Sequence, residues 1–108
     1  MSNFNVADFQ TAIEIQRVLV LSTGHLQEAT ARAWDQGDPG RCVEFGYLVW
    51  ACDPNWSQDE FTEHLLLSED PPEVKAAMRL AFENRCSYIR YDCDGPLVTR
   101  LAEHAYEW

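Results

Sequence analysis

The chain has 108 residues, the size of one domain, and 46% of them are hydrophobic, which excludes a disordered chain. Eighteen acidic residues against eight basic ones give a net charge of −10, and such a surface repels nucleic acid phosphates. No apolar run reaches the roughly 20 residues of a membrane span, and the first residues lack the basic start of a secretory signal. We therefore expect a cytoplasmic protein that binds neither nucleic acid nor membranes directly.

The first half of the chain predicts a helical arm, a strand and a helix. Apolar residues at helical spacing predict the arm within residues 1–16. Residues 17–23 contain four consecutive aliphatic side chains, a run typical of a strand buried on both faces. Residues 26–36 have helical spacing again, so that a strand, a tight turn and a helix form the start of a βαβ unit.

The second half predicts two strands around two helices. Residues 42–52 are rich in β-branched and aromatic side chains, and Gly46 within them indicates a bulge or a close backbone approach. Ser57 and Glu60 match a capping box that opens a short helix. Asp70 is expected to cap the next helix, with Pro71 at its first position. A third strand over residues 87–91 and an apolar tail over 97–108 complete the chain.

This order predicts a single α/β domain over residues 1–108, with a small three-stranded, mostly parallel sheet flanked by three or four helices. In a parallel sheet the carboxyl ends of all strands meet at one edge, where ligand sites are common. A sheet this small is also compatible with a homodimer.

Polar side chains follow each predicted strand and would meet at that edge. They are Ser22, Thr23 and His25 after the first strand, Asp53 after the second, and Asp92, Cys93 and Asp94 after the third. His25, oriented by Asp92 or Asp94, could then take a proton from Ser22 or Cys93. The same residues are also ordinary turn and cap residues, so a purely structural role is the competing interpretation.

The four cysteines, Cys42, Cys52, Cys86 and Cys93, are far apart in the sequence. Neither they nor the three histidines form the closely spaced ligand pairs that are typical of a zinc site. We therefore expect reduced thiols, no metal site and no cofactor.

One segment concentrates the negative charge. Six acidic residues fall within fifteen positions that contain no basic residue: Asp59, Glu60, Glu63, Glu69, Asp70 and Glu73. Such a surface can imitate DNA phosphates or dock on a cationic groove. Capping of two helix starts is the competing explanation, because helix dipoles favour acids there.

Three segments resemble a small uncharacterised domain family carried on bacterial plasmids, phages and integrative elements. They are Val-Leu-Val-Leu-Ser-Thr-Gly-His-Leu at 18–26, the aromatic segment 45–50, and Asp-Cys-Asp-Gly-Pro at 92–96. The resemblance covers most of the chain from about residue 17, although Arg85 stands where the pattern has a glycine. The family has no established activity, and the resemblance implies a mobile-element protein that acts on host machinery.

These observations predict an acidic, non-enzymatic protein that binds and inhibits a basic host protein, for example a nucleic-acid-binding effector. Anti-CRISPR or anti-restriction action, with possible mimicry of DNA, is the concrete form of this hypothesis. The alternative is a small enzyme or ligand-binding domain that uses His25, Ser22, Asp92 and Asp94.

Overall fold

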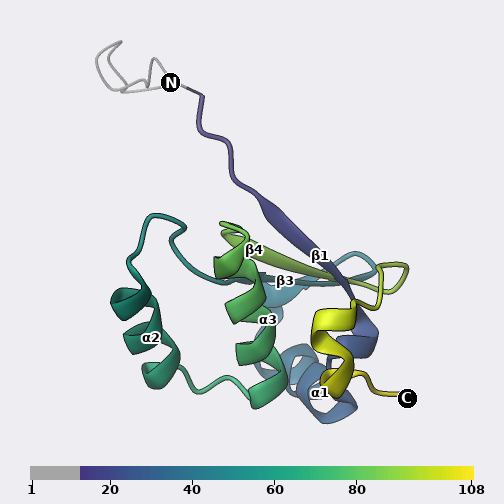
Figure 1. Ribbon diagram of the computed structural model, residues 1–108. Helices are drawn as coiled ribbons and strands as arrows, with labels where there is room; N and C mark the ends of the chain where they lie inside the picture. Colours follow the sequence, from purple (N-terminus) through teal and green to yellow (C-terminus); the bar gives the residue numbers. More distant parts are fainter. Residues whose placement is uncertain (1–12) are drawn as a thin grey trace.

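The computed structural model describes residues 13–108. A four-stranded sheet carries all the long helices on one face, and its other face is open (Figure 1). The elements in chain order are β1 (Val18–Ser22), η2 (Thr23–His25), α1 (Glu28–Gly37), η3 (Pro39–Arg41), β2 (Cys42–Val43), β3 (Gly46–Trp50), α2 (Gln58–Leu67), α3 (Pro72–Glu83), β4 (Tyr88–Asp92) and η4 (Thr99–His104).

The sheet is mixed rather than mostly parallel, which corrects the predicted arrangement. Its strand order is β1-β4-β3-β2, and only β1 and β4 are parallel, in register from Val18 opposite Tyr88 to Ser22 opposite Asp92. β3 runs antiparallel to β4 and also to β2. Two of the three expected strands therefore share a carboxyl edge, and the third does not.

The fourth strand arises because the predicted strand over 42–52 is divided by a turn. Phe45 adopts a φ of 66°, which bends the chain between β2 and β3 into a hairpin. Gly46 follows, where a Cβ atom would lie 1.7 Å from the carbonyl oxygen of Tyr91. The close-approach interpretation of this glycine is thus confirmed, since only a residue without a side chain fits against β4.

The helix starts differ in how well their local signals predicted them. α2 begins after Ser57 with the expected capping box, in which Ser57 Oγ accepts from Glu60 N and Glu60 accepts from Ser57 N. α3 begins one residue later than expected, at Pro72, and Asp70 does not cap it. At the far end of α3, Arg85 adopts a φ of 56°, a left-handed conformation that glycine adopts more readily than other residues.

The predicted helical arm is not seen where the structure describes it. Residues 13–17 form an exposed, irregular segment that leads into β1, and the rest of the predicted arm lies outside the described residues. β1 itself is buried on one face only, because the helices cover a single side of the sheet. Leu21 is fully buried there, while Val18 and Val20 are 45% and 42% exposed on the open face.

The core lies between the sheet and the three long helices, with α3 as the largest helical contributor. Val74, Ala77, Met78 and Ala81 of α3 are buried against Ile89 and its neighbours in the sheet. The tail contributes Leu101, as expected of an apolar chain end that packs on the domain. Within residues 13–108, no helix combines the length and the apolar character needed to cross a lipid bilayer.

Candidate functional site

The carboxyl ends of β1 and β4 lie side by side, because these two strands are parallel and in register. Ser22, His25, Asp92 and Asp94 are therefore at the same edge of the sheet, as predicted. Asp53 is not: it follows β3, which runs against β4, and so lies at the opposite end. Only the carboxyl ends of β1 and β4 therefore meet at the edge where all three predicted strands were expected to end.

His25 is fully buried and bonded on both sides to backbone groups. Its Nε2 accepts a hydrogen bond of 2.9 Å from the N–H of Val98, so this nitrogen carries no proton. Its Nδ1 lies 2.8 Å from the carbonyl oxygen of His104, to which it must donate. The imidazole thus joins the turn after β1 to the tail, and neither nitrogen is free to act as a base toward Ser22 or Cys93.

The aspartates form a local turn instead of orienting His25. Asp92 Oδ1 accepts from the Asp94 N–H at 2.8 Å, and its Oδ2 accepts from Arg90 Nε at 3.3 Å. These interactions, the backbone bond first, lower the pKa of the Asp92 carboxyl. Asp92, Cys93 and Asp94 place one potential ligand atom each within 4.8 Å of one another, but Cys93 and Asp94 are exposed.

Ser22 is also engaged locally, since its Oγ accepts from the Gly24 N–H at 3.0 Å. The four predicted residues consequently share an edge without forming one hydrogen-bonded group.

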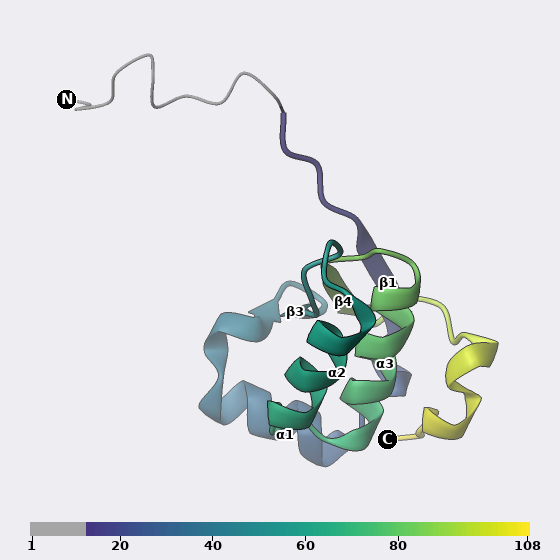
Figure 2. The same ribbon diagram turned by 60° about the vertical axis from the view of Figure 1, so that its left-hand side comes forward.

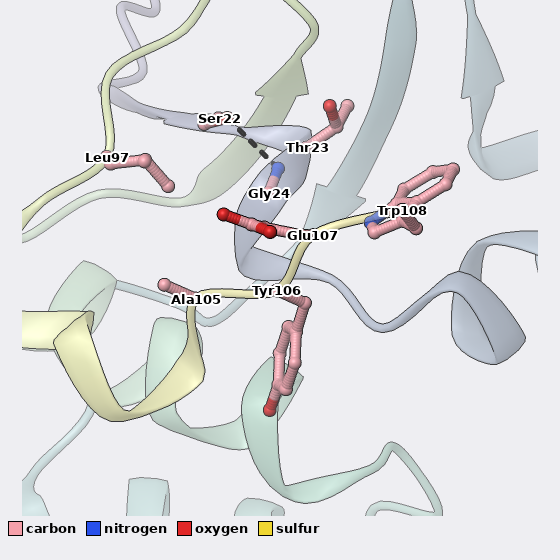
Figure 3. Close-up of a pocket in the computed structure, with 8 residues that line it drawn as sticks. All are labelled: Ser22, Thr23, Gly24, Leu97, Ala105, Tyr106, Glu107 and Trp108. Atoms are coloured by element: carbon pink, nitrogen blue, oxygen red, sulfur yellow. Dashed lines mark hydrogen bonds between the residues drawn. The ribbon is translucent and has the colours of Figure 1, made fainter.

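A pocket of about 540 Å³ opens beside this edge, between η2 and the last residues of the chain (Figure 3). It is lined by Ser22, Thr23, Gly24, Leu97, Ala105, Tyr106, Glu107 and Trp108. Among these lining residues, Ser22 and Thr23 were predicted to lie at this edge. The composition of the tail, which ends in an exposed aromatic residue, was the available signal for the others.

Hydrogen bonds to the turn after β1 hold the tail in place around the pocket. The Tyr106 N–H donates to the carbonyl of Gly24 at 2.7 Å, and Trp108 Nε1 donates to the carbonyl of Leu26 at 3.0 Å. Gly24 is packed closely within this arrangement, because a Cβ atom there would lie 3.1 Å from Leu97 and 3.2 Å from Ser22 Oγ.

The six predicted partner-binding acids divide into two groups. Asp70 is half-buried and pairs with Arg41 at 2.8 Å. Glu73 is 1% exposed, and it accepts hydrogen bonds from Thr30 Oγ1 at 2.5 Å and Gln27 Nε2 at 3.3 Å. These two acids support the fold and are not available to a partner, which corrects their predicted place in a binding surface.

The other four acids, Asp59, Glu60, Glu63 and Glu69, are exposed. The first three lie on the outward side of α2, which stands beside α3 in the helical layer (Figure 2). Leu66 and Leu67 share this side of the helix and are 78% and 77% exposed. We use the name α2 surface for the four exposed acids and the two leucines together: Asp59, Glu60, Glu63, Leu66, Leu67 and Glu69. None of its acids forms an ion pair with a base in the described part of the chain.

A family model described as the C-terminal domain of a family of unknown function, DUF5983, matches residues 18–108. No curated protein matches the chain, and no solved structure does. The match covers the sheet, the helices and the pocket, and it agrees with the predicted resemblance to an uncharacterised domain family.

Proposed function

We propose that this chain, which belongs to the DUF5983 family of unknown function, is a non-enzymatic protein that binds a basic protein through its α2 surface. The concrete form of the proposal is a mobile-element protein that inhibits a nucleic-acid-binding host effector, as anti-CRISPR and anti-restriction proteins do. Four exposed acids without basic partners, next to two exposed leucines, are the observation that carries this proposal.

The charges of the α2 surface are free to act on a partner. An exposed acid that already pairs with a base gains little from a second cation, whereas Asp59, Glu63 and Glu69 have no such pair in residues 13–108. The remaining acids of the chain add to the same negative field, which speeds encounter with a cationic groove.

Leu66 and Leu67 supply what charge alone does not. Exposed leucines are unfavourable in water, and burial of a leucine side chain contributes roughly 1.5–3 kcal/mol. They follow Glu63 by about one turn of α2 and precede Glu69, so a partner with basic residues beside an apolar strip fits the whole surface.

The test uses two charge-reversed variants of equal charge. The first changes Asp59→Lys, Glu63→Lys and Glu69→Lys, and leaves Glu60 in place because its carboxylate belongs to the capping box. The matched control changes Glu14→Lys, Glu44→Lys and Glu103→Lys, three exposed acids outside the α2 surface. Each immobilised protein is incubated with host lysate, and captured proteins are identified by mass spectrometry.

We expect the wild type and the control to capture the same basic proteins at about 50 mM salt and to release them at about 500 mM, because salt screens exposed charges. The α2 variant should lose them. Capture that survives both the reversals and the high salt would overturn the proposal.

The alternative, a small enzyme that uses His25, Ser22, Asp92 and Asp94, lacks the histidine base on which it depends, because His25 is bonded to backbone on both sides.

A further inference from the structure

We infer that the pocket between η2 and residues 105–108 binds a small organic amine in its ammonium form. This site is distinct from the α2 surface and does not depend on the function proposed for it. Three features of the pocket carry the inference: a rigid frame, a single unpaired carboxylate, and an apolar wall of suitable size.

The frame is built from bonds that join two distant parts of the chain. His25 bonds His104, Tyr106 bonds Gly24, and Trp108 bonds Leu26, so three residues of the turn hold three alternate residues of the tail. Both chain neighbours of Glu107 are thus hydrogen-bonded to the turn, Tyr106 through its N–H and Trp108 through its indole, and these bonds fix the backbone position of Glu107. A site held in this way loses little conformational entropy when a ligand binds.

Glu107 is the one charged side chain among the residues that line the pocket. Its carboxylate is directed toward the turn at Gly24, whereas the ring of Tyr106 points away from it toward the helices (Figure 3). No base in residues 13–108 forms an ion pair with it. The carboxylate is thus available as a charged hydrogen-bond acceptor at the mouth of the pocket.

Glu107 is the acceptor that selects a cation. Ser22 and Thr23 also line the pocket, but Ser22 Oγ already accepts from the Gly24 N–H, and the Thr23 side chain points away from Glu107 (Figure 3). An ammonium group carries three donors and no acceptor, so a carboxylate without a basic partner among the described residues suits it. An anion would meet Glu107 and the net charge of −10 instead, and both repel it.

The rest of the wall is apolar and would contact the hydrocarbon part of the amine. Leu97 and Trp108 are 64% and 58% exposed, and both border the pocket with Ala105. The volume of about 540 Å³ lies within the range of small-molecule sites. An aromatic side chain next to a carboxylate also favours a cationic ligand through its π electrons.

The experiment titrates the full chain with benzylammonium chloride and, separately, with benzyl alcohol, which has the same ring and no charge. Amide and indole N–H signals are followed by NMR, with Gly24 and the Trp108 indole as reporters. Glu107→Gln removes the charge and preserves the shape of the side chain. Glu103→Gln is the matched control, since Glu103 is an exposed acid of η4 that does not line the pocket.

Benzylammonium should shift the Gly24 and Trp108 signals saturably in the wild type and in Glu103→Gln. In Glu107→Gln the affinity should fall about tenfold, because a charged hydrogen bond is lost. The affinity of the wild type for benzyl alcohol should be no higher than the affinity of Glu107→Gln for benzylammonium. Equal binding of the alcohol, equal affinity in Glu107→Gln, shifts confined to other surfaces, or no saturable shift would each overturn the inference.

Discussion

Glu73 and His25 show how burial changes the role of a polar residue. Both were candidates for a functional surface or site, and both are 1% exposed. Each is bonded to groups more than 40 residues away in the sequence, Glu73 to Thr30 and His25 to Val98. Residues of this kind hold distant segments together, and their removal would leave buried partners without hydrogen bonds.

Two buried tyrosines lead to opposite predictions. Tyr47 donates to Asp35 at 2.8 Å, whereas the Tyr91 hydroxyl has no hydrogen-bond partner among the described residues. Tyr47→Phe should therefore lower the free energy of unfolding by about 1 kcal/mol. Tyr91→Phe should leave it unchanged or raise it by up to about 1 kcal/mol, because an unpaired polar group leaves the core. Urea denaturation of both variants measures the difference.

The same residues predict a loss of stability at high pH. Burial, followed by the bond to Asp35, raises the pKa of Tyr47 to about 12, and burial raises the pKa of Tyr91 as well. In the unfolded chain a tyrosine ionises near pH 10, so their contribution is complete below about pH 10 and is lost as pH rises through the folded values. Stability that stays constant from pH 9 to pH 12 would contradict this assignment.

At the scale of an element, the starts of α2 and α3 show when a local sequence signal predicts the structure correctly. The capping box of α2 needs only Ser57 and Glu60, three residues apart, and it forms as predicted. Asp70 is of a residue type that caps helices, yet α3 begins only after Pro71, and Asp70 pairs with Arg41, 29 residues earlier. A local signal holds where no distant partner competes for the same side chain.

The capping box gives a prediction with a matched control. Ser57→Ala removes the acceptor for the Glu60 N–H and should lower the free energy of unfolding by about 1 kcal/mol. Thr62→Ala, an exposed change within the same helix, should alter it by less than about 0.5 kcal/mol. Thermal unfolding followed by circular dichroism compares the two. Equal effects would show that the cap does not stabilise α2.

The balance of charge is a property of the whole molecule. Eighteen acids meet eight bases, and five ion pairs form among residues 13–108. Most acids therefore repel one another across the folded surface, and this repulsion opposes the compact state.

Salt should consequently stabilise the protein. An increase from about 50 to about 500 mM sodium chloride shortens the Debye length and should raise the melting temperature by a few degrees. The variant with reversed charges at Asp59, Glu63 and Glu69 is six charges less negative and should show a smaller rise. Differential scanning calorimetry measures both, and a melting temperature that falls with salt would be evidence against charge repulsion.

The sequence by itself determined the α/β class, the capping box of α2, the close approach at Gly46 and the excess of negative charge. Each of these depends on residue types or on spacings of a few positions, which interact within a turn or a strand. Tertiary structure alone decided that β3 runs against β4, that Glu73 is buried while Glu63 is exposed, and that residues 105–108 form a pocket with the turn after β1. Strand direction and burial depend on contacts between segments that are distant in the sequence, and those contacts cannot be predicted from local periodicity.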